Sequence, residues 1–410
     1  MKEKIISLST SGKVKLQCCM NEVPVGVWQF GQRTLDQFTY DENWLQTRHR
    51  RPLSLSMPTR SRPYRGQVVS SFFDNLLPEL PALRNRLAAR LNTGSSAGDI
   101  LSELGRDCAG AVQLFPEGMQ RASEARVSGV PLKPSYLERF LKVVPRSPIL
   151  RCLRQHFRVA LAGTNEKTAL LYYQDQWRFP THSTATTHIF KLGPSTENEW
   201  LCHLILRAYG VATARSKLIP VGDMLALAVE RFDRRWCAHG MRLLRVPVED
   251  LCQALGIPGE SKYDVTIKQV LDLLLGSSLG QRDREEFLRR QILYWMLGAC
   301  DGHAKNFSLF LEAHGRFHLA PSYDVVSHYP DPGKMAMAVG GEYEWDRIEY
   351  KHWLATARQC RLQNQLPALI RQLVEQTPAA LESVRAQLPP GFPGAAILAR
   401  VQDAADRLSH

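Results

Sequence analysis

The chain has 410 residues, a formal net charge of +12 at pH 7, and a composition that is 44% hydrophobic and 22% charged. A chain of this length is too long to fold around one hydrophobic core, so two domains or lobes are expected. The composition excludes global disorder. The sequence contains no run of about 18 apolar residues, so we predict no membrane span and expect a cytoplasmic location.

The basic excess favours polyanionic partners such as nucleic acid or nucleotide phosphates, although charges spread evenly over the surface would give the same total. The nine cysteines are irregularly spaced and form no CxxC pair. Their pattern therefore indicates neither a disulfide framework nor a zinc site, and we expect buried thiols in a reducing compartment.

The first third of the chain is expected to mix strands and helices. Clusters of β-forming residues predict strands, and a longer apolar periodicity interrupted by two prolines predicts a helical segment. The proline- and glycine-containing stretch 116–148 is the predicted subdomain boundary. The predicted elements are strands at Val23–Phe30 and Phe38–Leu45, helix at Ser71–Leu91, a turn and strand at Gly105–Phe115, and a short helix at Ser135–Val144.

Residues 157–235 are again rich in β-forming residues, and they predict successive strands with one helix at Asn198–Tyr209. From about Val248 onward, amphipathic helical patterns dominate. We therefore expect an α+β fold with two lobes, a β-rich mixed N-terminal lobe and a mostly helical C-terminal lobe. Protein kinases use this order, but the order alone does not decide a function. The helical segments are VEDLCQALG, TIKQVLDLLLG, REEFLRRQILYWMLGA, HWLATARQC, LPALIRQLVEQTPAALESVRAQL and AAILARVQDAADRL.

The segment CDGHAKNFSLFL carries the most informative spacing, because Asp301 and Asn306 lie five residues apart. In kinase catalytic loops an Asp accepts or orients the substrate hydroxyl proton, and an Asn five residues later binds magnesium. Such a pair also occurs by chance. Here it follows a predicted helix and precedes a predicted strand, so rigid elements hold it on both sides.

Asp324 follows a predicted hairpin that turns near His314 and Gly315. An Asp at the end of a second strand is the arrangement of a metal-binding Asp that reaches phosphates through magnesium. The alternative is an Asp that caps a helix after the strand. Considered together with Asp301 and Asn306, the metal role is favoured.

Lys191 lies in the strand-like segment THIFKLG among apolar neighbours. A buried Lys requires a partner, and binding of nucleotide phosphates would explain its place. Glu199, at the start of the next predicted helix, is the expected ion-pair partner. The alternative is an edge strand with Lys191 pointing into solvent.

Two further segments are candidates for nucleotide contacts. Gly163 lies between two predicted strands, where a glycine hairpin lays backbone N–H groups against phosphates, or where it forms an ordinary turn. The strand LAVERFDRR ends in charge, and Glu230 and Phe232 would offer backbone groups to adenine at a hinge. His303, within the loop of Asp301, would touch phosphate or order the loop.

Motifs along nearly the whole chain resemble the HipA family of bacterial toxin kinases. The N-terminal part matches through VGVW, PLSLSMP, FFDNLLPE and GRDCAGAVQL. The remainder matches through LAGTNEKTALL, TTHIFKLG, LALAVERFDRRW, LLRVPVEDLCQALG, YWMLGACDGHAKNFSLF and LAPSYDVVS. The resemblance implies an N-terminal subdomain at 1–120, a nucleotide-binding part at 121–247, and a catalytic lobe at 248–410.

The resemblance implies a serine/threonine protein kinase that uses ATP and Mg²⁺. Its expected target is an aminoacyl-tRNA synthetase, commonly the glutamyl enzyme, so that translation stops and dormancy or persistence follows. A small DNA-binding antitoxin, HipB, would hold the toxin and repress the shared operon with it. The implied roles are Asp301 as the catalytic aspartate, Asn306 and Asp324 as metal ligands, and as nucleotide-binding residues Ala162, Gly163, Thr164, Asn165, Glu166, Lys167, Lys191, Glu230, Phe232, Asp233, His303 and Lys305.

Two departures from the family pattern concern regulation. Family members typically carry a serine in S-x-A-G as an autophosphorylation site, and this chain has Ala160 there, so phosphorylation at that position is impossible. The segment between Lys191 and Glu199 is also short, where the family often has a longer loop near the substrate site.

Two other classes of function use the same features. A small-molecule kinase would need the same Asp and Asn pair with a distal Asp. An inactive kinase fold that binds an antitoxin and DNA would suit the positive net charge and Ala160, but the intact Asp301, Asn306, Asp324 and Lys191 argue against it.

Overall fold

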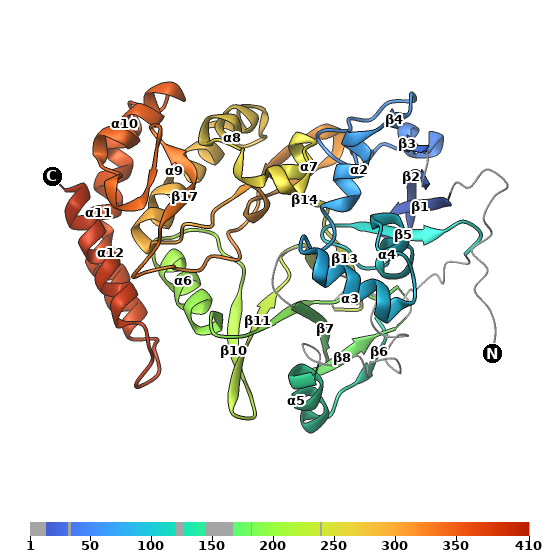
Figure 1. Cartoon of the computed structure of the whole chain (residues 1–410), viewed down its shortest axis with the longest axis horizontal. Coiled ribbons are helices and arrows are strands. Elements are labelled where there is room, and N and C mark those ends of the chain that lie inside the picture. Colours follow the sequence, from blue (N-terminus) through green and yellow to red (C-terminus); the bar gives the residue numbers. More distant parts are fainter. Residues whose placement is uncertain are drawn as a thin grey trace.

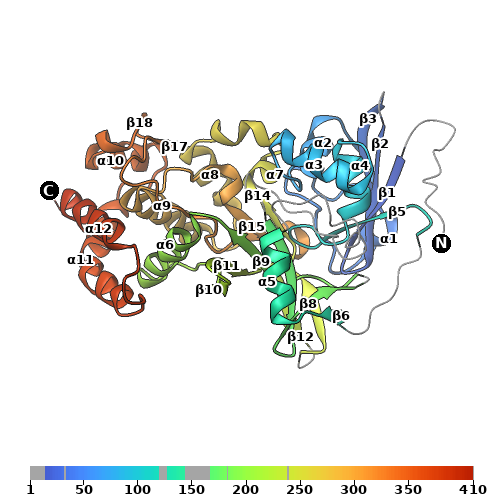
Figure 2. The same cartoon turned by 60° about the horizontal axis from the view of Figure 1, so that its bottom comes forward.

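A computed structural model describes residues 14–31, 34–119, 127–143, 167–181, 183–237 and 240–409. The chain runs from an N-terminal sheet with its helices, through a central sheet, to a helical end where α11 and α12 lie farthest from the N-terminal sheet (Figures 1 and 2). This arrangement confirms the predicted α+β fold, in which β-rich parts precede a mostly helical part.

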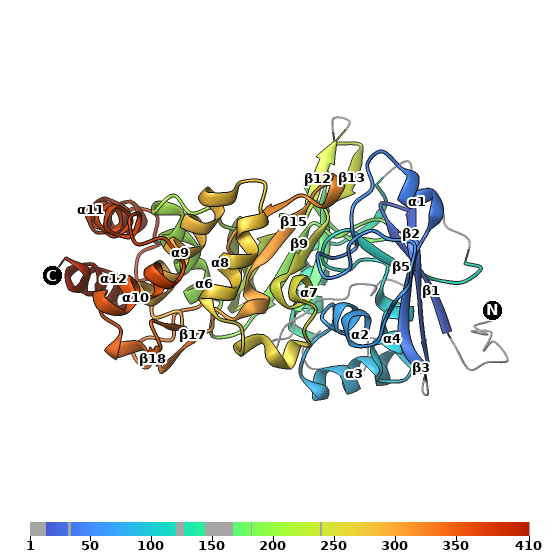
Figure 3. The same cartoon turned by 90° about the horizontal axis from the view of Figure 1, so that it is seen from above.

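The N-terminal part is a five-stranded antiparallel sheet in the order β4-β3-β2-β1-β5. Helices α2, α3 and α4 lie on the side of this sheet that faces the rest of the molecule (Figure 3). Trp28 of β2 stacks on Phe73 of α2 with ring centroids 3.9 Å apart, in the middle of this core. The elements are β1 (Val14–Met20), β2 (Val23–Gly31), β3 (Thr34–Tyr40), α1 (Glu42–Gln46), β4 (Tyr64–Arg65), α2 (Gln67–Asp74), α3 (Pro81–Leu91), α4 (Ala97–Leu104) and β5 (Val112–Pro116).

The strand predicted at Phe38–Leu45 is wrong in its second half. Strand β3 ends at Tyr40, and a short helix, α1, begins at Glu42. Asp41 explains the change, because its side chain accepts hydrogen bonds from the backbone N–H groups of Asn43 and Trp44 and so caps the helix. The other predicted elements of this part are confirmed, with the helical segment divided into α2 and α3 near the two prolines.

The central part is a six-stranded antiparallel sheet in the order β10-β11-β9-β7-β8-β6. Helix α6 packs on β10 and β11, and α5 contributes Phe140 and Leu141 to the core over the sheet. The predicted strand FRVALAG lies outside the described residues. The elements are β6 (Gly129–Pro131), α5 (Pro134–Val143), β7 (Lys167–Tyr173), β8 (Gln176–Pro180), β9 (His188–Leu192), α6 (Thr196–Ala208), β10 (Ser216–Val221), β11 (Met224–Glu230), β12 (Arg234–Cys237) and β13 (Arg242–Arg245).

The C-terminal part is built around α9, whose second half is buried on every side. The predicted helix VEDLCQALG begins instead as a strand, because Asp250 caps α7 with a capping box and leaves Val248–Asp250 to pair with β15. The elements are β14 (Val248–Asp250), α7 (Leu251–Leu255), α8 (Ile267–Leu273), α9 (Gly280–Leu297), β15 (Ser308–Leu311), β16 (Phe317–Leu319), β17 (Lys334–Val339), β18 (Glu342–Glu344), α10 (Tyr350–Gln359), α11 (Leu366–Arg385) and α12 (Ala395–Leu408).

Among the described residues, no helix is both long enough and apolar enough to cross a bilayer. Eight cysteines of the described ranges are free thiols, and all of them except Cys237 are buried.

Candidate active site

A cleft of about 330 Å³ lies where the central sheet meets the C-terminal part. It brings together residues that are far apart in the sequence, from strands β7 and β9 and from the loops that follow α9 and β16. The sequence-predicted residues that line it are Lys167, Lys191, Glu230, Phe232, Asp233, Asp301, His303, Lys305, Asn306 and Asp324.

The loop that carries Asp301 is fixed at its start by the end of α9. Gly298 ends this helix with φ of 66°, a left-handed conformation that favours glycine. Gly302 lies against the Tyr294 ring, where an added Cβ would be 2.9 Å from a ring carbon. The Asn306 amide donates to the Asp301 carbonyl oxygen at 2.7 Å, which locks the loop and leaves the amide oxygen of Asn306 free of that bond.

Asp324 has φ of 57°, a conformation that is costly for a residue other than glycine. Its neighbour Tyr323 anchors it, because the Tyr323 hydroxyl bonds to Ser308 Oγ at 2.7 Å and to the Lys305 carbonyl at 2.8 Å. Residues 320–333 form no helix, so the alternative of a helix cap is wrong for Asp324.

Two lysines converge on Asp324 from adjacent strands. Lys191 of β9 and Lys167 of β7 are direct partners in the sheet register. Their Nζ atoms lie 2.6 Å and 3.0 Å from the two carboxylate oxygens of Asp324. Lys191 also bonds both oxygens of Glu199, at 2.6 and 2.8 Å, which confirms the predicted ion pair. Strand β9 lies inside the sheet, between β11 and β7, so the edge-strand alternative is wrong.

The two lysines and two carboxylates balance one another in charge. Burial by itself would raise the pKa of Asp324, but Lys167 and Lys191 outweigh it and hold that pKa well below its usual range. Burial by itself would lower the pKa of Lys191, but Asp324 and Glu199 outweigh it and raise that pKa. Each charged side chain of the cluster therefore lies beside a group of opposite formal charge.

Lys167→Gln is expected to lower the free energy of unfolding by about 1.5–3 kcal/mol, the usual contribution of a hydrogen bond to a charged group. Because the folded pKa of Asp324 is below its unfolded value, this stabilisation is present above the unfolded pKa and is lost as pH falls through the folded pKa. Urea titrations at several pH values between about 5 and 8 should therefore show a constant difference from the parent chain.

The matched control for this prediction is Lys334→Gln. Lys334 pairs with Glu344 at 3.4 Å, but its side chain is 70% exposed. We expect its loss to change stability by no more than about 0.5 kcal/mol. If the two substitutions changed the free energy of unfolding equally, Lys167 would stabilise the fold no more than an exposed ion pair does.

The predicted hinge lies at the end of β11. The Phe232 side chain is partly buried and packs against Phe310 and Tyr323, with ring centroids 5.8 and 5.6 Å apart, where it lines the cleft. Glu230 is exposed, and its backbone N–H donates to the Arg215 carbonyl. Asp233 lines the cleft too, but its carboxylate is engaged by Arg231 and Arg234 and by the backbone N–H of Gly110. The Asp233 carboxylate therefore stabilises the fold at the hinge through these contacts.

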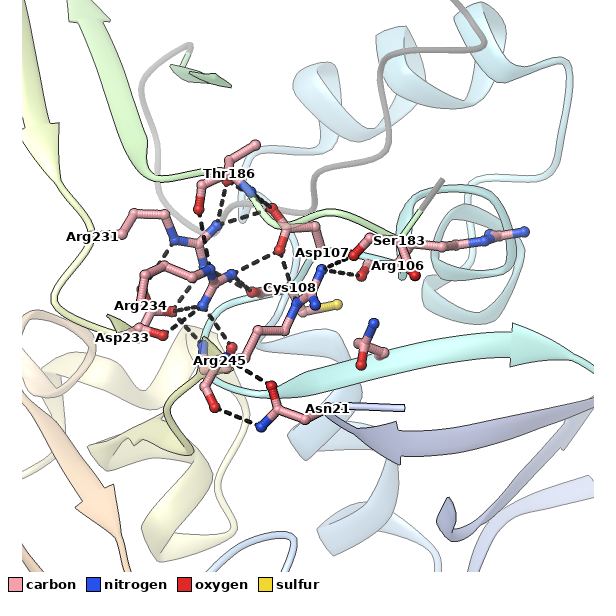
Figure 4. A network of polar contacts seen from close by, with 12 residues as sticks. Asn21, Arg106, Asp107, Cys108, Ser183, Thr186, Arg231, Asp233, Arg234 and Arg245 are labelled. Carbon is pink, nitrogen blue, oxygen red and sulfur yellow. Dashed lines mark hydrogen bonds and ion pairs between the residues drawn. The ribbon is translucent and has the colours of Figure 1, made fainter. Parts of the chain in front are cut away.

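A buried network of three arginines and two aspartates surrounds this hinge (Figure 4). Asp107, from the loop before β5, accepts from Arg234 at 2.8 Å, from Arg245 at 3.2 Å and from Arg231 at 3.4 Å. It also accepts from the Thr186 hydroxyl at 2.7 Å. Burial would raise the pKa of Asp107, but the arginines hold it well below its usual range. The network joins the N-terminal part to the hinge.

His303 and Lys305 line the cleft, and both have partners within the protein. The Lys305 ammonium is buried and bonds to Asp250 at 2.7 Å and to Asn75 Oδ1 at 2.8 Å. His303 Nε2 lies 3.8 Å from Asp301 Oδ1, and burial lowers the pKa of His303. These contacts favour roles in holding the loop, and direct contact of either residue with nucleotide stays a prediction.

The N-terminal part supplies residues to the cleft that the sequence did not predict: Asn75, Glu79, Ala109 and Gly110. Gly110 has φ of 67°, and an added Cβ there would be 2.4 Å from the Val248 carbonyl oxygen. The GRDCAG motif gave a signal of a turn, but nothing in it showed which part of the chain this turn would meet. The predicted phosphate loop, residues Ala162, Gly163, Thr164, Asn165 and Glu166, lies outside the described residues, and so does Ala160.

The oxygen ligands offered by Asp324 and Asn306 suit magnesium. Among the described residues, no three His, Cys, Asp or Glu side chains are grouped so that they could hold a metal ion. Magnesium does not require such a group, because proteins usually bind it through one or two carboxylates together with substrate phosphates and water. The Asp324 carboxylate and the Asn306 amide oxygen, which both line the cleft, fit this mode.

Family models match two regions of the chain. The model described as the HipA N-terminal domain matches residues 16–115, and the HipA-like C-terminal domain matches residues 159–381. The second region alone is more than half of the chain. The chain belongs to the HipA family.

Relatives of the same family are similar over most of their length. A protein of Sinorhizobium fredii described as a kinase, Y4mE, is 32% identical over 86% of this chain and 88% of its own. The serine/threonine-protein kinase toxin HipA of Shewanella oneidensis is 28% identical over 93% of this chain and 92% of its own. These likenesses support kinase activity for this HipA family chain.

A solved structure has the same fold. It is HipA of Shewanella oneidensis in a complex with HipB and its operator DNA, with a TM-score of 0.80, 24% identity, and 96% of both chains covered. At this identity the likeness shows the fold, so the described part of the chain has the HipA fold.

Proposed function

We propose that this chain is a serine/threonine protein kinase that transfers the γ-phosphate of ATP to a protein target with the help of Mg²⁺. The observation that carries the proposal is the convergence of Asp301, Asn306 and Asp324 on one cleft with the Lys191–Glu199 ion pair. These are the parts that phosphoryl transfer requires in protein kinases: a hydroxyl-orienting Asp, metal-binding Asn and Asp, and a phosphate-binding Lys paired with Glu.

Different residues of the chain would bind the nucleotide and accept the proton of the acceptor hydroxyl. Lys191 and Lys167 hold the phosphates, while Phe232 packs beside the adenine at the hinge. Magnesium, when bound, neutralises charge on the phosphates, and Asn306 and Asp324 are the residues that would hold it. Asp301 orients the acceptor hydroxyl and takes its proton as the phosphoryl group transfers.

We further propose that the kinase is the toxin of a toxin–antitoxin pair, with a HipB-like DNA-binding antitoxin as its partner. The similar HipA of Shewanella oneidensis is named a toxin, and its structure was solved with HipB and operator DNA. The +12 net charge suits a complex on operator DNA, where the pair would repress its own operon. The proposed target is an aminoacyl-tRNA synthetase such as the glutamyl enzyme, whose phosphorylation would arrest growth.

The proposal is tested by incubating the purified full chain with γ-labelled ATP, Mg²⁺ and a bacterial lysate. We expect labelled phosphoserine or phosphothreonine in one or a few proteins, and no label when EDTA removes Mg²⁺. A labelled metabolite without labelled protein would indicate a small-molecule kinase instead. No labelled product, together with no heat of ATP binding in calorimetry, would indicate a binding module.

A further inference from the structure

Tyr263, which no sequence pattern singled out, contacts the catalytic aspartate directly. Its hydroxyl donates to Asp301 Oδ1 at 2.7 Å. Burial and the nearby Asp301 carboxylate raise the pKa of Tyr263, so the hydroxyl keeps its proton and acts as the donor. The Asp301 carboxylate therefore already accepts a hydrogen bond from a hydroxyl group of the protein itself.

Contacts on several sides hold the Tyr263 ring in this place. The ring lies edge-on to His303, with centroids 5.1 Å apart at 85°. Lys262 Nζ lies 5.1 Å from the ring centroid and pairs with Glu79 of the N-terminal part at 2.6 Å. The loop that carries Tyr263 is thus tied to the catalytic loop and to the N-terminal part at once.

The proposed kinase function, on which this inference rests, requires the hydroxyl of the protein acceptor to donate to Asp301. A tyrosine hydroxyl is the same kind of donor as a serine or threonine hydroxyl, and it lies at the distance of a formed hydrogen bond. We propose that Tyr263 occupies the acceptor-hydroxyl position beside Asp301 and competes with the protein substrate for it.

Tyr263 can leave this position without opening the core. The residue is 49% exposed, whereas His303 and Lys262 beside it are buried. A rotation of the side chain would carry the ring into solvent and leave Asp301 free, while the Lys262–Glu79 pair stays in place. Tyr263 therefore marks the place where the substrate hydroxyl enters, at the rim formed by Glu79, Lys262 and the catalytic loop.

The test is Tyr263→Phe, which removes the hydroxyl and keeps the ring against His303. Label transfer from γ-labelled ATP is measured at increasing concentrations of bacterial lysate protein. Loss of an internal competitor should lower the half-saturating lysate concentration by about three- to tenfold, the range that one ordinary hydrogen bond contributes, because solvent reaches the bond between Tyr263 and Asp301. The plateau rate and the half-saturating ATP concentration should not change.

The matched control is Tyr343→Phe, which removes the hydroxyl of a tyrosine that is 44% exposed and does not line the cleft. It should leave all three quantities unchanged. An unchanged or higher half-saturating lysate concentration in Tyr263→Phe, or a lower plateau, would show that Tyr263 assists the substrate or has no part in its binding. A parent chain that labels no protein would instead contradict the kinase function itself.

Discussion

Asp301→Asn is expected to lower phosphoryl transfer to protein by about a hundredfold or more, because the amide cannot take the proton of the acceptor hydroxyl. The substitution keeps the size of the side chain. It also keeps the bond from Asn306 to the carbonyl oxygen of residue 301, which is a backbone group. The loop should therefore keep its shape, and the loss should lie in the rate of transfer.

Binding measurements separate this expectation from a folding defect. Lys167, Lys191 and Phe232 are untouched in Asp301→Asn, so calorimetry should show ATP affinity close to that of the parent chain. Asp346→Asn is the matched control, because Asp346 is exposed and does not line the cleft. Transfer by Asp301→Asn within severalfold of the control would rule out Asp301 as the proton acceptor.

Asp107→Asn is expected to destabilise the chain by about 3–5 kcal/mol, the usual cost of removing one partner from a buried ionic network. Asp107 is the carboxylate that Arg231, Arg234 and Arg245 share, and the side chains of all four residues are at most 5% exposed. When the substitution removes the charge of residue 107, Asp233 is the one carboxylate that remains in the network for three guanidinium groups. Urea unfolding followed by far-UV circular dichroism should show a lower midpoint.

The control for Asp107 is a second aspartate that binds an arginine through two bonds. Asp74 accepts from Arg84 at 2.6 and 2.8 Å, but its side chain is 40% exposed. Solvent screens this pair, so Asp74→Asn should cost no more than about 1 kcal/mol. A midpoint for Asp107→Asn equal to that of Asp74→Asn would mean that the arginine network contributes little to stability.

Spacing along the chain, together with the family resemblance, indicated the residues of the candidate site, and the structure brings those that it describes to one cleft. Asp301 and Asn306 lie on one short loop, so their sequence separation nearly fixes their geometry. Lys191 was recognisable because a lysine among apolar strand residues needs a buried partner. Glu199 offers one, because it lies in the first turn of the helix that follows this strand. These are local signals, and the one contact that they predicted, the Lys191–Glu199 ion pair, is present in the structure.

Contacts between distant segments could not be predicted in the same way. Gly110 and Glu79 reach the cleft only because the N-terminal part packs against the C-terminal part, and neither residue carries a local sign of this. The segment RFDRRW gave the signal of a strand that ends in charge, whereas the side chains of two of its arginines, Arg231 and Arg234, are buried around Asp107. A charge run usually lies in solvent, and the partner that reverses this expectation is more than 100 residues away in the sequence.

In the proposed kinase, the two lysines and two carboxylates of this cluster would make ligand binding an exchange of partners. Lysines that turn toward phosphate would free Asp324 for a cation, and an Asp324 that turns toward a cation would free Lys167 and Lys191 for phosphate. Either ligand alone would leave part of the cluster without its counter-ion in a largely buried site. Nucleotide and cation should therefore strengthen each other's binding, and thermodynamic reciprocity requires the factor to be the same in both directions.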